Sequence, residues 1–284
     1  MKINYIDDIY KFSEDSKVIF CDLWGVIHNG KEPFKGSLEF LEKMNAQNIP
    51  IIFISNAPRP NQIVRKGLTE KLGIKSHMYH SVITSGDISV LHINREIHGT
   101  KYYHLGPEKD HDLLKEIKIA QVSEIIECDF VLCTGLDDDD KEKPQDYEDI
   151  LKTMILNNIL MICVNPDQIV IRGDKEIPCA GAIASYYESL GGKVISYGKP
   201  HNEIYEYALT YALENKIIKS KSEILTIGDS FRTDIKGALD FGLKSIFIEA
   251  GIHNKEINSL EDIKDLAKKF IDSEFKEINI IKNL

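Results

Sequence analysis

The stretch Val18-Ile19-Phe20-Cys21-Asp22-Leu23-Trp24-Gly25-Val26 decides the fold of this chain. An apolar run ends abruptly in a carboxylate and a glycine follows, which is the pattern of a buried strand that presents an acid at its exposed tip. In open α/β sheets, ligands bind beyond the carboxyl ends of the strands. Asp22 is therefore a candidate reactive group, although an aspartate in a turn after a strand also occurs in many proteins without such a role.

The same pattern returns three times further along the chain. Apolar runs lead into Ser55 and Asn56, into Lys199, and into Asp229, and Asp234 follows five residues after the last of these. Segments with the apolar spacing of helices lie between the runs. This alternation predicts an α/β protein with a Rossmann-like, doubly wound parallel sheet.

Each of these groups also has an ordinary structural explanation. Ser55 and Asn56 are typical of a turn or a helix cap. Lys199, which precedes a proline, could be a surface lysine, and Asp234 could cap the helix that follows it. Their order along the chain is what favours a shared site, because strand ends of one parallel sheet meet at one edge.

The middle of the chain has strands and helices of its own, which predicts an inserted domain. We expect a discontinuous core formed by residues 1–82 and 188–284, with an α/β cap domain at 83–187. Lys193–Tyr197 is interpreted as a strand of the core. The acidic run at 137–140 is more simply a solvated loop than a metal site, because consecutive side chains point in different directions.

Composition excludes several classes of protein. With 284 residues and a net charge of −10, the chain lacks the basic surface that nucleic acid or an anionic membrane requires. No run approaches the roughly 18 apolar residues of a membrane span, and no secretory signal begins the sequence. The five cysteines form no CxxC pair and are interpreted as reduced core residues, which predicts a cytoplasmic protein.

The order and spacing of Asp22, Ser55, Lys199 and Gly228-Asp229-Ser230-Phe231-Arg232-Thr233-Asp234 resemble the four motifs of the haloacid-dehalogenase-like (HAD) hydrolase superfamily. The resemblance covers nearly the whole chain. The insertion between the second and third motifs, with Asn165-Pro166-Asp167 and the small residues of Cys179-Ala180-Gly181-Ala182, is similar to class IIA, the nitrophenylphosphatase-like and nucleotide-phosphatase-like group.

The resemblance implies a magnesium-dependent phosphatase that acts on a small phosphorylated metabolite through an aspartyl-phosphate intermediate. Asp22 would be the nucleophile, Ser55 and Lys199 would bind the phosphate and assist catalysis, and Asn56 would lie close by in the substrate site. Mg²⁺ would be held by Asp22, Asp229, Asp234 and the backbone carbonyl of Trp24.

The charges of the candidate site support a bound metal ion independently of the family resemblance. Three carboxylates within about 4 Å of one another would repel by roughly 4 kcal/mol per pair at a surface-like dielectric. A magnesium ion and the Lys199 ammonium would cancel those three charges and leave positive groups oriented toward a phosphate.

One position departs from the family pattern. Phosphatases of the superfamily carry a second aspartate two residues after the nucleophile, where this chain has Trp24. Tryptophan cannot transfer a proton, and general acid–base catalysis is worth about 10² to 10⁴ in rate. The chain could be a slow phosphatase, could use His28, His201 or a cap residue instead, or could be a non-hydrolytic phosphate-binding or regulatory protein, or a dehalogenase.

The remaining candidates stay open at this level. His28 is more simply a solvent-facing loop residue, and His201 is similarly ambiguous. In the cap, Asn165, Asp167 and Arg172 could contact substrate or could serve only the loop. Neither the physiological substrate nor the choice between a monomer and a homodimer follows from the sequence.

Overall fold

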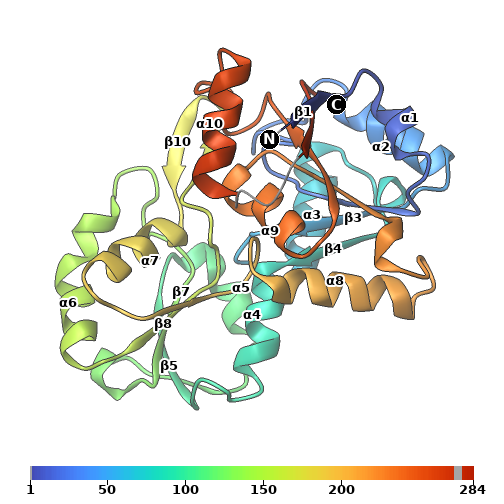
Figure 1. Cartoon of the computed structure of the whole chain (residues 1–284). Helices are drawn as coiled ribbons and strands as arrows, with labels where there is room; N and C mark the ends of the chain where they lie inside the picture. The colour runs from blue at the N-terminus through green and yellow to red at the C-terminus, as the bar shows by residue number, and fades with distance from the viewer. Residues whose placement is uncertain (1, 272–276) are drawn as a thin grey trace.

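Two parallel sheets and one hairpin form the framework of the chain (Figure 1). The computed structural model describes residues 2–271 and 277–284. The larger sheet has seven strands, the smaller has five, and the hairpin is antiparallel. Both sheets lie in an alternation of strands and helices, which confirms the predicted α/β class.

The seven-stranded sheet has the order β1-β14-β13-β12-β2-β3-β4, and every neighbouring pair is parallel. Its central strands are buried along their whole length, which explains their nearly continuous apolar sequences. The strands are β1 (Lys2–Tyr5), β2 (Val18–Cys21), β3 (Ile51–Ser55), β4 (Ser81–Thr84), β12 (Ile224–Gly228), β13 (Lys244–Ile248) and β14 (Glu277–Ile281).

The five-stranded sheet has the order β11-β8-β7-β5-β6 and is also parallel throughout. It occupies the lower left of Figure 1, with the hairpin rising above it. Its strands are β5 (Lys101–Leu105), β6 (Ala120–Gln121), β7 (Phe130–Cys133), β8 (Leu160–Cys163) and β11 (Val194–Ser196), and the hairpin is β9 (Ile169–Arg172) with β10 (Lys175–Pro178).

Helices connect the strands and cover the sheets (Figure 1). No helix of the described ranges is long and apolar enough to cross a membrane. The α-helices are α1 (Ile9–Ser13), α2 (Ser37–Ala46), α3 (Asn61–Leu72), α4 (Ser85–Ile93), α5 (His111–Leu114), α6 (Glu148–Leu156), α7 (Ala180–Ser189), α8 (Asn202–Glu214), α9 (Lys236–Asp240) and α10 (Leu260–Phe270). Short 3₁₀ turns are η1 (Ser76–Met78), η2 (Glu108–Asp110), η3 (Ile125–Glu127), η4 (Pro144–Tyr147) and η5 (Lys221–Glu223), and η6 (Phe231–Ile235) is a π-helical turn.

Two strands differ from the sequence-based expectation. Lys193–Tyr197 was expected in the core, but β11 pairs with β8 in the smaller sheet. The short strand Val194-Ile195-Ser196 would look the same in either sheet, so its partner depends on tertiary packing alone. β1 was not expected at all, because Lys2–Tyr5 alternates polar and apolar residues at the edge of the sheet, where it pairs only with β14.

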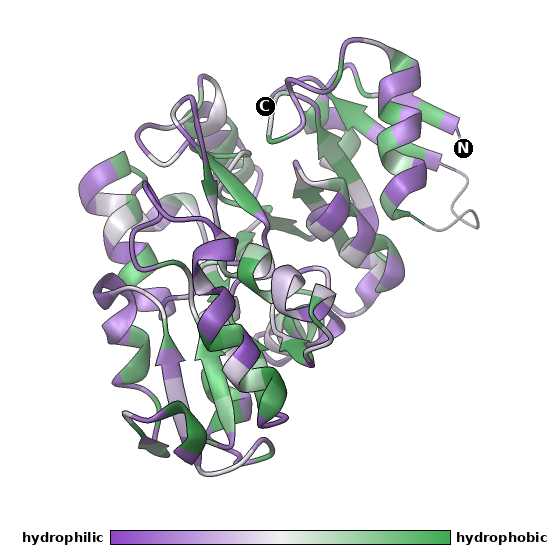
Figure 2. Cartoon of the chain, turned by 90° about the vertical axis from the view of Figure 1, so that its left-hand side faces the viewer, coloured by the Kyte–Doolittle hydropathy of each residue, from purple (hydrophilic) through white to green (hydrophobic). Residues whose placement is uncertain are grey.

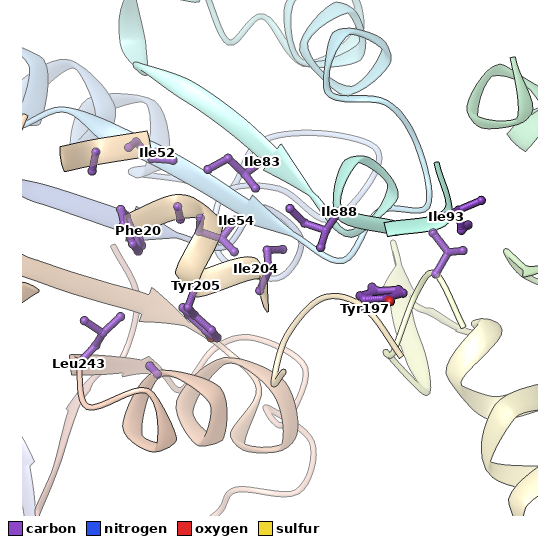
Figure 3. Close-up of a cluster of buried hydrophobic side chains, with 14 of the residues drawn as sticks. Phe20, Ile52, Ile54, Ile83, Ile88, Ile93, Tyr197, Ile204, Tyr205 and Leu243 are labelled. Atoms are coloured by element: carbon purple, nitrogen blue, oxygen red, sulfur yellow. The ribbon is translucent and has the colours of Figure 1, made fainter. Parts of the chain in front are cut away.

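Hydrophobic packing continues from one sheet to the other. One cluster of buried side chains includes Phe20 and Ile52 of the larger sheet, Phe130 of the smaller sheet, and Ile88 of α4. Figure 3 shows that Ile88, Ile93 and Tyr197 extend this cluster away from the larger sheet. Figure 2 shows green, hydrophobic strands and many purple, hydrophilic segments on the helices and loops around them. The two sheets are therefore joined by a packed apolar contact.

Candidate active site

Three neighbouring strands place polar residues at one edge of the larger sheet. β12, β2 and β3 lie side by side and run in the same direction. Asp229 directly follows β12, Asp22 directly follows β2, and Ser55 is the last residue of β3. The backbone N–H of Asp22 donates to the carbonyl of Ile227 at 2.9 Å, so the pairing of β2 with β12 extends to the acid itself.

Asp22, Asp229 and Asp234 form one buried acidic cluster. One carboxylate oxygen of each lies within 4.8 Å of the others. Asp229 is packed so closely that a Cβ at Gly25 would lie 1.9 Å from its Oδ2, and a Cβ at Gly251 would lie 2.1 Å from its Cβ. The two glycines thus leave the space that lets this carboxylate approach Asp22. Within the described residues, this is the one group of acidic, histidine and cysteine side chains that meets a metal-ligand geometry.

Lys199 neutralises part of this charge. Its ammonium forms ion pairs with Asp22 and, at 2.7 Å, with Asp234, and all three side chains are buried. The surface-lysine interpretation is therefore wrong. A segment more than a hundred residues distant from Asp22 in sequence supplies the cation, as the order of the motifs predicted.

Asn56 holds Lys199 in place. Its Oδ1 accepts the Lys199 backbone N–H at 2.8 Å, and its Nδ2 donates to the Lys199 carbonyl at 3.0 Å and to Asp167 Oδ1 at 2.9 Å. Gly198 permits this approach, because its φ is +108° and a Cβ there would lie 2.6 Å from Asn56 Oδ1. The Asn56 amide thus has both N–H groups engaged within the protein.

Burial and charge perturb the protonation of the cluster. Burial raises the pKa of Asp22 to about 7, although Lys199 opposes the shift. Burial and the neighbouring carboxylates Asp22 and Asp234 raise the pKa of Asp229 well above its usual range. Burial alone would lower the pKa of Lys199, but the attraction of Asp22 and Asp234 outweighs it and keeps the ammonium charged. The cluster therefore favours an added cation.

Ser55 and Asp234 serve the local backbone as well as the site. Ser55 Oγ accepts the N–H of Ala57 at 3.2 Å, which is the turn role considered for it, and it still lines the cavity. Asp234 does not cap the following helix, since Ser230 caps η6 instead. Asp234 Oδ2 accepts the backbone N–H groups of Asp229 and Ser230 at 3.2 and 3.1 Å, while Oδ1 faces Lys199.

A cavity of about 750 Å³ opens above these residues. Its walls come from both sheets and from the β9–β10 hairpin. Among the lining residues are Asp22, Ser55, Lys199, Asp229, Asp234, His28, Arg59, Asp110, Asp167 and Arg172. Such a volume accommodates a small phosphorylated molecule.

Trp24 reaches across the cavity to the hairpin. Its indole Nε1–H donates to the backbone carbonyl of Ile171 in β9 at 2.8 Å. Gly30 makes room for the ring, because a Cβ there would lie 2.3 Å from the indole. A second link joins the same segments, since the Gly173 N–H donates to the Asn29 carbonyl at 3.2 Å. Trp24 and Asn29 therefore tie the loop after β2 to the hairpin.

Replacing Trp24 with phenylalanine should loosen the hairpin. The substitution removes the indole donor, and one such hydrogen bond contributes about 1 kcal/mol. We expect amide hydrogens in 169–178 to exchange about fivefold faster. Hydrogen exchange measured by mass spectrometry tests this. Tyr187→Phe is the control, because it removes a hydrogen bond from a side chain to a backbone carbonyl, that of Ile159, outside the hairpin. Unchanged exchange in 169–178 would show that Trp24 does not restrain the hairpin.

The two histidines have different surroundings. His28 is 6% exposed, so the prediction of a solvent-facing residue is wrong. Its ring packs edge-on against Trp24, its Nδ1 accepts the Gly30 N–H at 3.0 Å, and burial lowers its pKa to about 4. His201 is exposed at the N-cap of α8 and does not line the cavity.

The acidic run at 137–140 anchors the hairpin by ion pairs. Both terminal nitrogens of Arg172 contact Asp139, at 3.1 and 2.8 Å, and Lys175 contacts Asp140 at 2.6 Å. Lys109 also pairs with Asp139. The prediction of a simply solvated loop is therefore incomplete, because Asp139 is largely buried in this network.

Sequence reasoning did not find two features of the cavity wall. The ion pair of Arg59 Nε with the buried Asp110, at 3.1 Å, was not anticipated; Arg59 closes the polar stretch after β3, but nothing in the sequence indicates its partner. The Trp24–Ile171 contact leaves no sequence signal, because any residue offers a backbone carbonyl. Two candidates that the sequence left open also lie in this wall. Asn165 Oδ1 accepts the Asp167 N–H at 3.0 Å, and Asp167 Oδ1 accepts a hydrogen bond from Asn56 Nδ2 at 2.9 Å.

Comparisons with known proteins agree with this architecture. Residues 19–120 match a family model described as haloacid dehalogenase-like hydrolase, and residues 196–272 match a second, HAD-hydrolase-like model. The chain is 34% identical to a haloacid dehalogenase-like hydrolase from Brucella suis 1330, with a TM-score of 0.85 and coverage of 98% of this chain and 99% of that one.

More distant relatives carry phosphatase names. An acid sugar phosphatase of Staphylococcus aureus is 25% identical over 269 residues, which cover 91% of this chain and 98% of the relative. A structure from Cytophaga hutchinsonii described as a possible sugar phosphatase has 24% identity, a TM-score of 0.78, and coverage of 98% and 97%. A p-nitrophenyl phosphatase from Archaeoglobus fulgidus has a similar fold, with 21% identity and a TM-score of 0.70 over 95% of this chain and 97% of that one. This chain belongs to the haloacid dehalogenase-like hydrolase family.

Proposed function

We propose that this protein is a magnesium-dependent phosphatase that transfers a phosphoryl group from a small phosphorylated metabolite to Asp22 and then hydrolyses the aspartyl phosphate. The observation that carries the proposal is the buried Asp22 carboxylate, paired with Lys199 and adjacent to Asp229 and Asp234 in one cavity. A carboxylate so placed can act as a nucleophile beside groups that attract a phosphate.

The residues support a two-step reaction. An Asp22 oxygen attacks phosphorus, and the bond from phosphorus to the leaving oxygen breaks. Water then attacks the phosphorus of the aspartyl phosphate, and the bond to Asp22 breaks. Lys199 and Ser55 donate to the phosphoryl oxygens in both steps, where negative charge accumulates. Asn56 supports this role by fixing the backbone of Lys199 rather than through a free N–H.

The acidic cluster fits a hard divalent cation. Its donors are all carboxylate oxygens, they are buried, and three carboxylates face a single lysine. Asp22, Asp229 and Asp234 would hold Mg²⁺, with the carbonyl of Trp24 as a further ligand. The ion would supply positive charge that offsets the charge of the phosphate and of the cluster.

Asp229→Asn should weaken magnesium binding while preserving the fold. The amide keeps the shape that Gly25 and Gly251 accommodate but removes one negative charge. We expect magnesium affinity to fall by about 10- to 100-fold. Calorimetric titration of wild type and variant measures this, and exposed Asp240→Asn is a control for general loss of negative charge. Equal affinity in wild type and Asp229→Asn would contradict the assignment.

Sugar phosphates are the first substrates to try. The Staphylococcus aureus and Cytophaga hutchinsonii relatives are described as sugar phosphatases, and the cavity is of suitable size. A screen should measure phosphate release from sugar phosphates, nucleotides, pyridoxal phosphate and aryl phosphates, with and without Mg²⁺. The same samples should be assayed for halide release from 2-haloacids, because an aromatic residue at position 24 also resembles dehalogenases. Tight binding of a phosphate ester without turnover would favour a binding or regulatory protein instead.

We also propose that the chain divides into a core and a substrate-specificity cap, near the expected boundaries of 1–82 with 188–284 and of 83–187. Membership of the strands in two sheets supports the division, and the pairing of β11 with β8 favours a second boundary after Ser196. The continuous hydrophobic cluster between the sheets favours a stiff connection near α4.

A further inference from the structure

Trp24 leaves the proposed reaction without its usual proton donor, and the cavity limits what can replace it. His28 is an unsuitable donor, because burial keeps it unprotonated at neutral pH and its Nδ1 is already occupied by Gly30. Asp110 and Asp139 are each paired with a cation, Arg59 and Arg172 respectively. The pairs with Arg172 and Lys109 outweigh burial and lower the pKa of Asp139, so this carboxylate stays ionised. Burial raises the pKa of Asp110 although Arg59 opposes the shift, but Asp110 Oδ1 is held by the Arg59 Nε–H at 3.1 Å.

Asp167 differs from the other carboxyl groups of the cavity wall. Its direct side-chain partner is an uncharged amide, since Asn56 Nδ2 donates to Oδ1 at 2.9 Å. In the described residues, no hydrogen bond engages its Oδ2. The side chain is partly buried and lines the same cavity as Asp22 and Lys199. One oxygen is therefore anchored while the other is free to hold a proton toward a ligand.

The loop that carries Asp167 is held rigidly. The Asp167 N–H donates to Asn165 Oδ1 at 3.0 Å, in a turn closed by a side chain. Pro166 packs against Gly198, where a Cβ would lie 3.2 Å from the proline Cδ. The loop can approach the Lys199 segment closely because Gly198, which precedes Lys199, has no side chain.

Asn56 couples Asp167 to the catalytic centre. The same amide that contacts Asp167 also brackets the backbone N–H and carbonyl of Lys199. Lys199 in turn pairs with Asp22. Asp167 comes from the region of the smaller sheet, yet a single side chain fixes it relative to the nucleophile.

The electrostatic surroundings suit proton exchange. Burial raises the pKa of Asp167 to about 6, with Lys199 and the Asn56 hydrogen bond opposing the shift. The Asp234 carboxylate raises the pKa of Asp167 further, and Arg232 lowers it. The charge of Asp167 in turn raises the pKa of Asp22. A carboxyl group in this range can both give and accept a proton near neutral pH.

On the basis of the phosphatase function proposed above, we infer that Asp167 is the general acid and base that replaces the missing aspartate at position 24. As Asp22 attacks phosphorus and the bond to the leaving oxygen breaks, the Asp167 proton passes to that oxygen and an alcohol departs. The Asp167 carboxylate then takes a proton from the attacking water as the bond between phosphorus and Asp22 breaks. Phosphate is released and Asp167 is protonated again, so atoms and charge balance.

The test compares substrates whose leaving groups do and do not need a proton. For Asp167→Asn, we expect kcat/KM for ethyl phosphate to fall by about 10² to 10⁴, and kcat/KM for p-nitrophenyl phosphate to change by less than roughly threefold, because nitrophenolate leaves without protonation. Nitrophenolate should appear in a burst equal to the enzyme concentration, since the second step has lost its base. Asp149→Asn, an exposed cap carboxylate, is the matched control and should match wild type on both substrates.

Two further measurements separate catalysis from structure. At saturating Mg²⁺, which favours the ionised form of Asp22, wild-type kcat/KM for ethyl phosphate should decline as pH rises through about 6, where Asp167 loses its proton. This decline should be absent in Asp167→Asn. Adding Trp24→Asp to Asp167→Asn should restore part of the ethyl phosphate activity by returning a carboxyl group to the cavity. Unfolding temperatures of all variants show whether the fold is intact.

The outcomes distinguish this inference from the proposed function. If wild type hydrolyses neither ester with Mg²⁺ present, the proposed phosphatase function is wrong, and the role inferred for Asp167 is wrong as well. If wild type is active and kcat/KM of Asp167→Asn falls equally for both esters, or falls for neither, only the assignment of Asp167 is overturned.

Discussion

Replacing Asp22 with asparagine is expected to lower phosphatase turnover by about 10⁴-fold or more, the scale of loss that follows removal of a catalytic nucleophile. An amide is a poor nucleophile, and it also withdraws one charged ligand from the metal cluster. Phosphate release from the best substrate of the screen measures the loss. Glu39→Gln, at an exposed ion pair on α2, is the control for charge removal. Retention of more than about one hundredth of wild-type activity would mean that Asp22 is not the nucleophile.

The same variant should change the pH dependence of stability in metal-free protein. The pKa of Asp22 is about 7 in the folded protein and near 3.8 in its ordinary state, so the folded protein binds more protons between these values. Stability contributed by the protonated carboxyl is present below about pH 4 and is lost as pH rises toward 7. Asp22→Asn cannot lose a proton there. Its free energy of unfolding should therefore fall less than that of wild type between pH 5 and pH 8, measured in urea with a chelator.

Lys199→Met is expected to reduce the free energy of unfolding by about 3–5 kcal/mol, because it leaves buried Asp22 and Asp234 without their cation. Methionine fills much of the same volume, so the loss is chiefly electrostatic. Phosphate turnover should disappear as well, since the phosphoryl oxygens lose a charged donor. Urea unfolding at neutral pH without metal measures the stability.

The control for this prediction is Lys236→Met. Lys236 pairs with Asp240 at 2.7 Å on the surface, where such a pair contributes about 0.3–0.5 kcal/mol. The stability lost in Lys199→Met should be smaller at pH 5, because burial raises the pKa of Asp22 to about 7 and its protonation removes part of the uncompensated charge. A loss no larger than that of Lys236→Met would show that the acidic cluster does not depend on Lys199.

Much of the candidate site was predictable because strand ends are visible in the sequence. Asp22, Ser55 and Asp229 each follow or end a buried apolar strand, and parallel strands present such residues at one edge. The structure brings these three residues together with Lys199 and Asp234, as their order in the chain predicted. Their catalytic and metal-binding roles remain predictions for the experiments above.

The parts that were missed depend on distant partners. β11 was assigned to the wrong sheet because the sequence of a three-residue strand does not indicate which strand it pairs with. His28 was expected in solvent although Trp24 packs against it. A loop residue is buried or exposed according to what folds over it. Sequence patterns describe periodicity within a segment and do not describe that covering.

The amino-acid sequence by itself determined the α/β class, the apolar strands and the polar groups at their tips, because burial on both faces of a parallel strand requires a continuous apolar run. Only the tertiary structure decided that Trp24 binds the Ile171 carbonyl, that Asn56 joins Lys199 to Asp167, and that Asp139 anchors Arg172. These contacts connect segments that are far apart in the chain, and several use backbone atoms common to all residues. Their choice of partner follows from how the two sheets and the hairpin pack together.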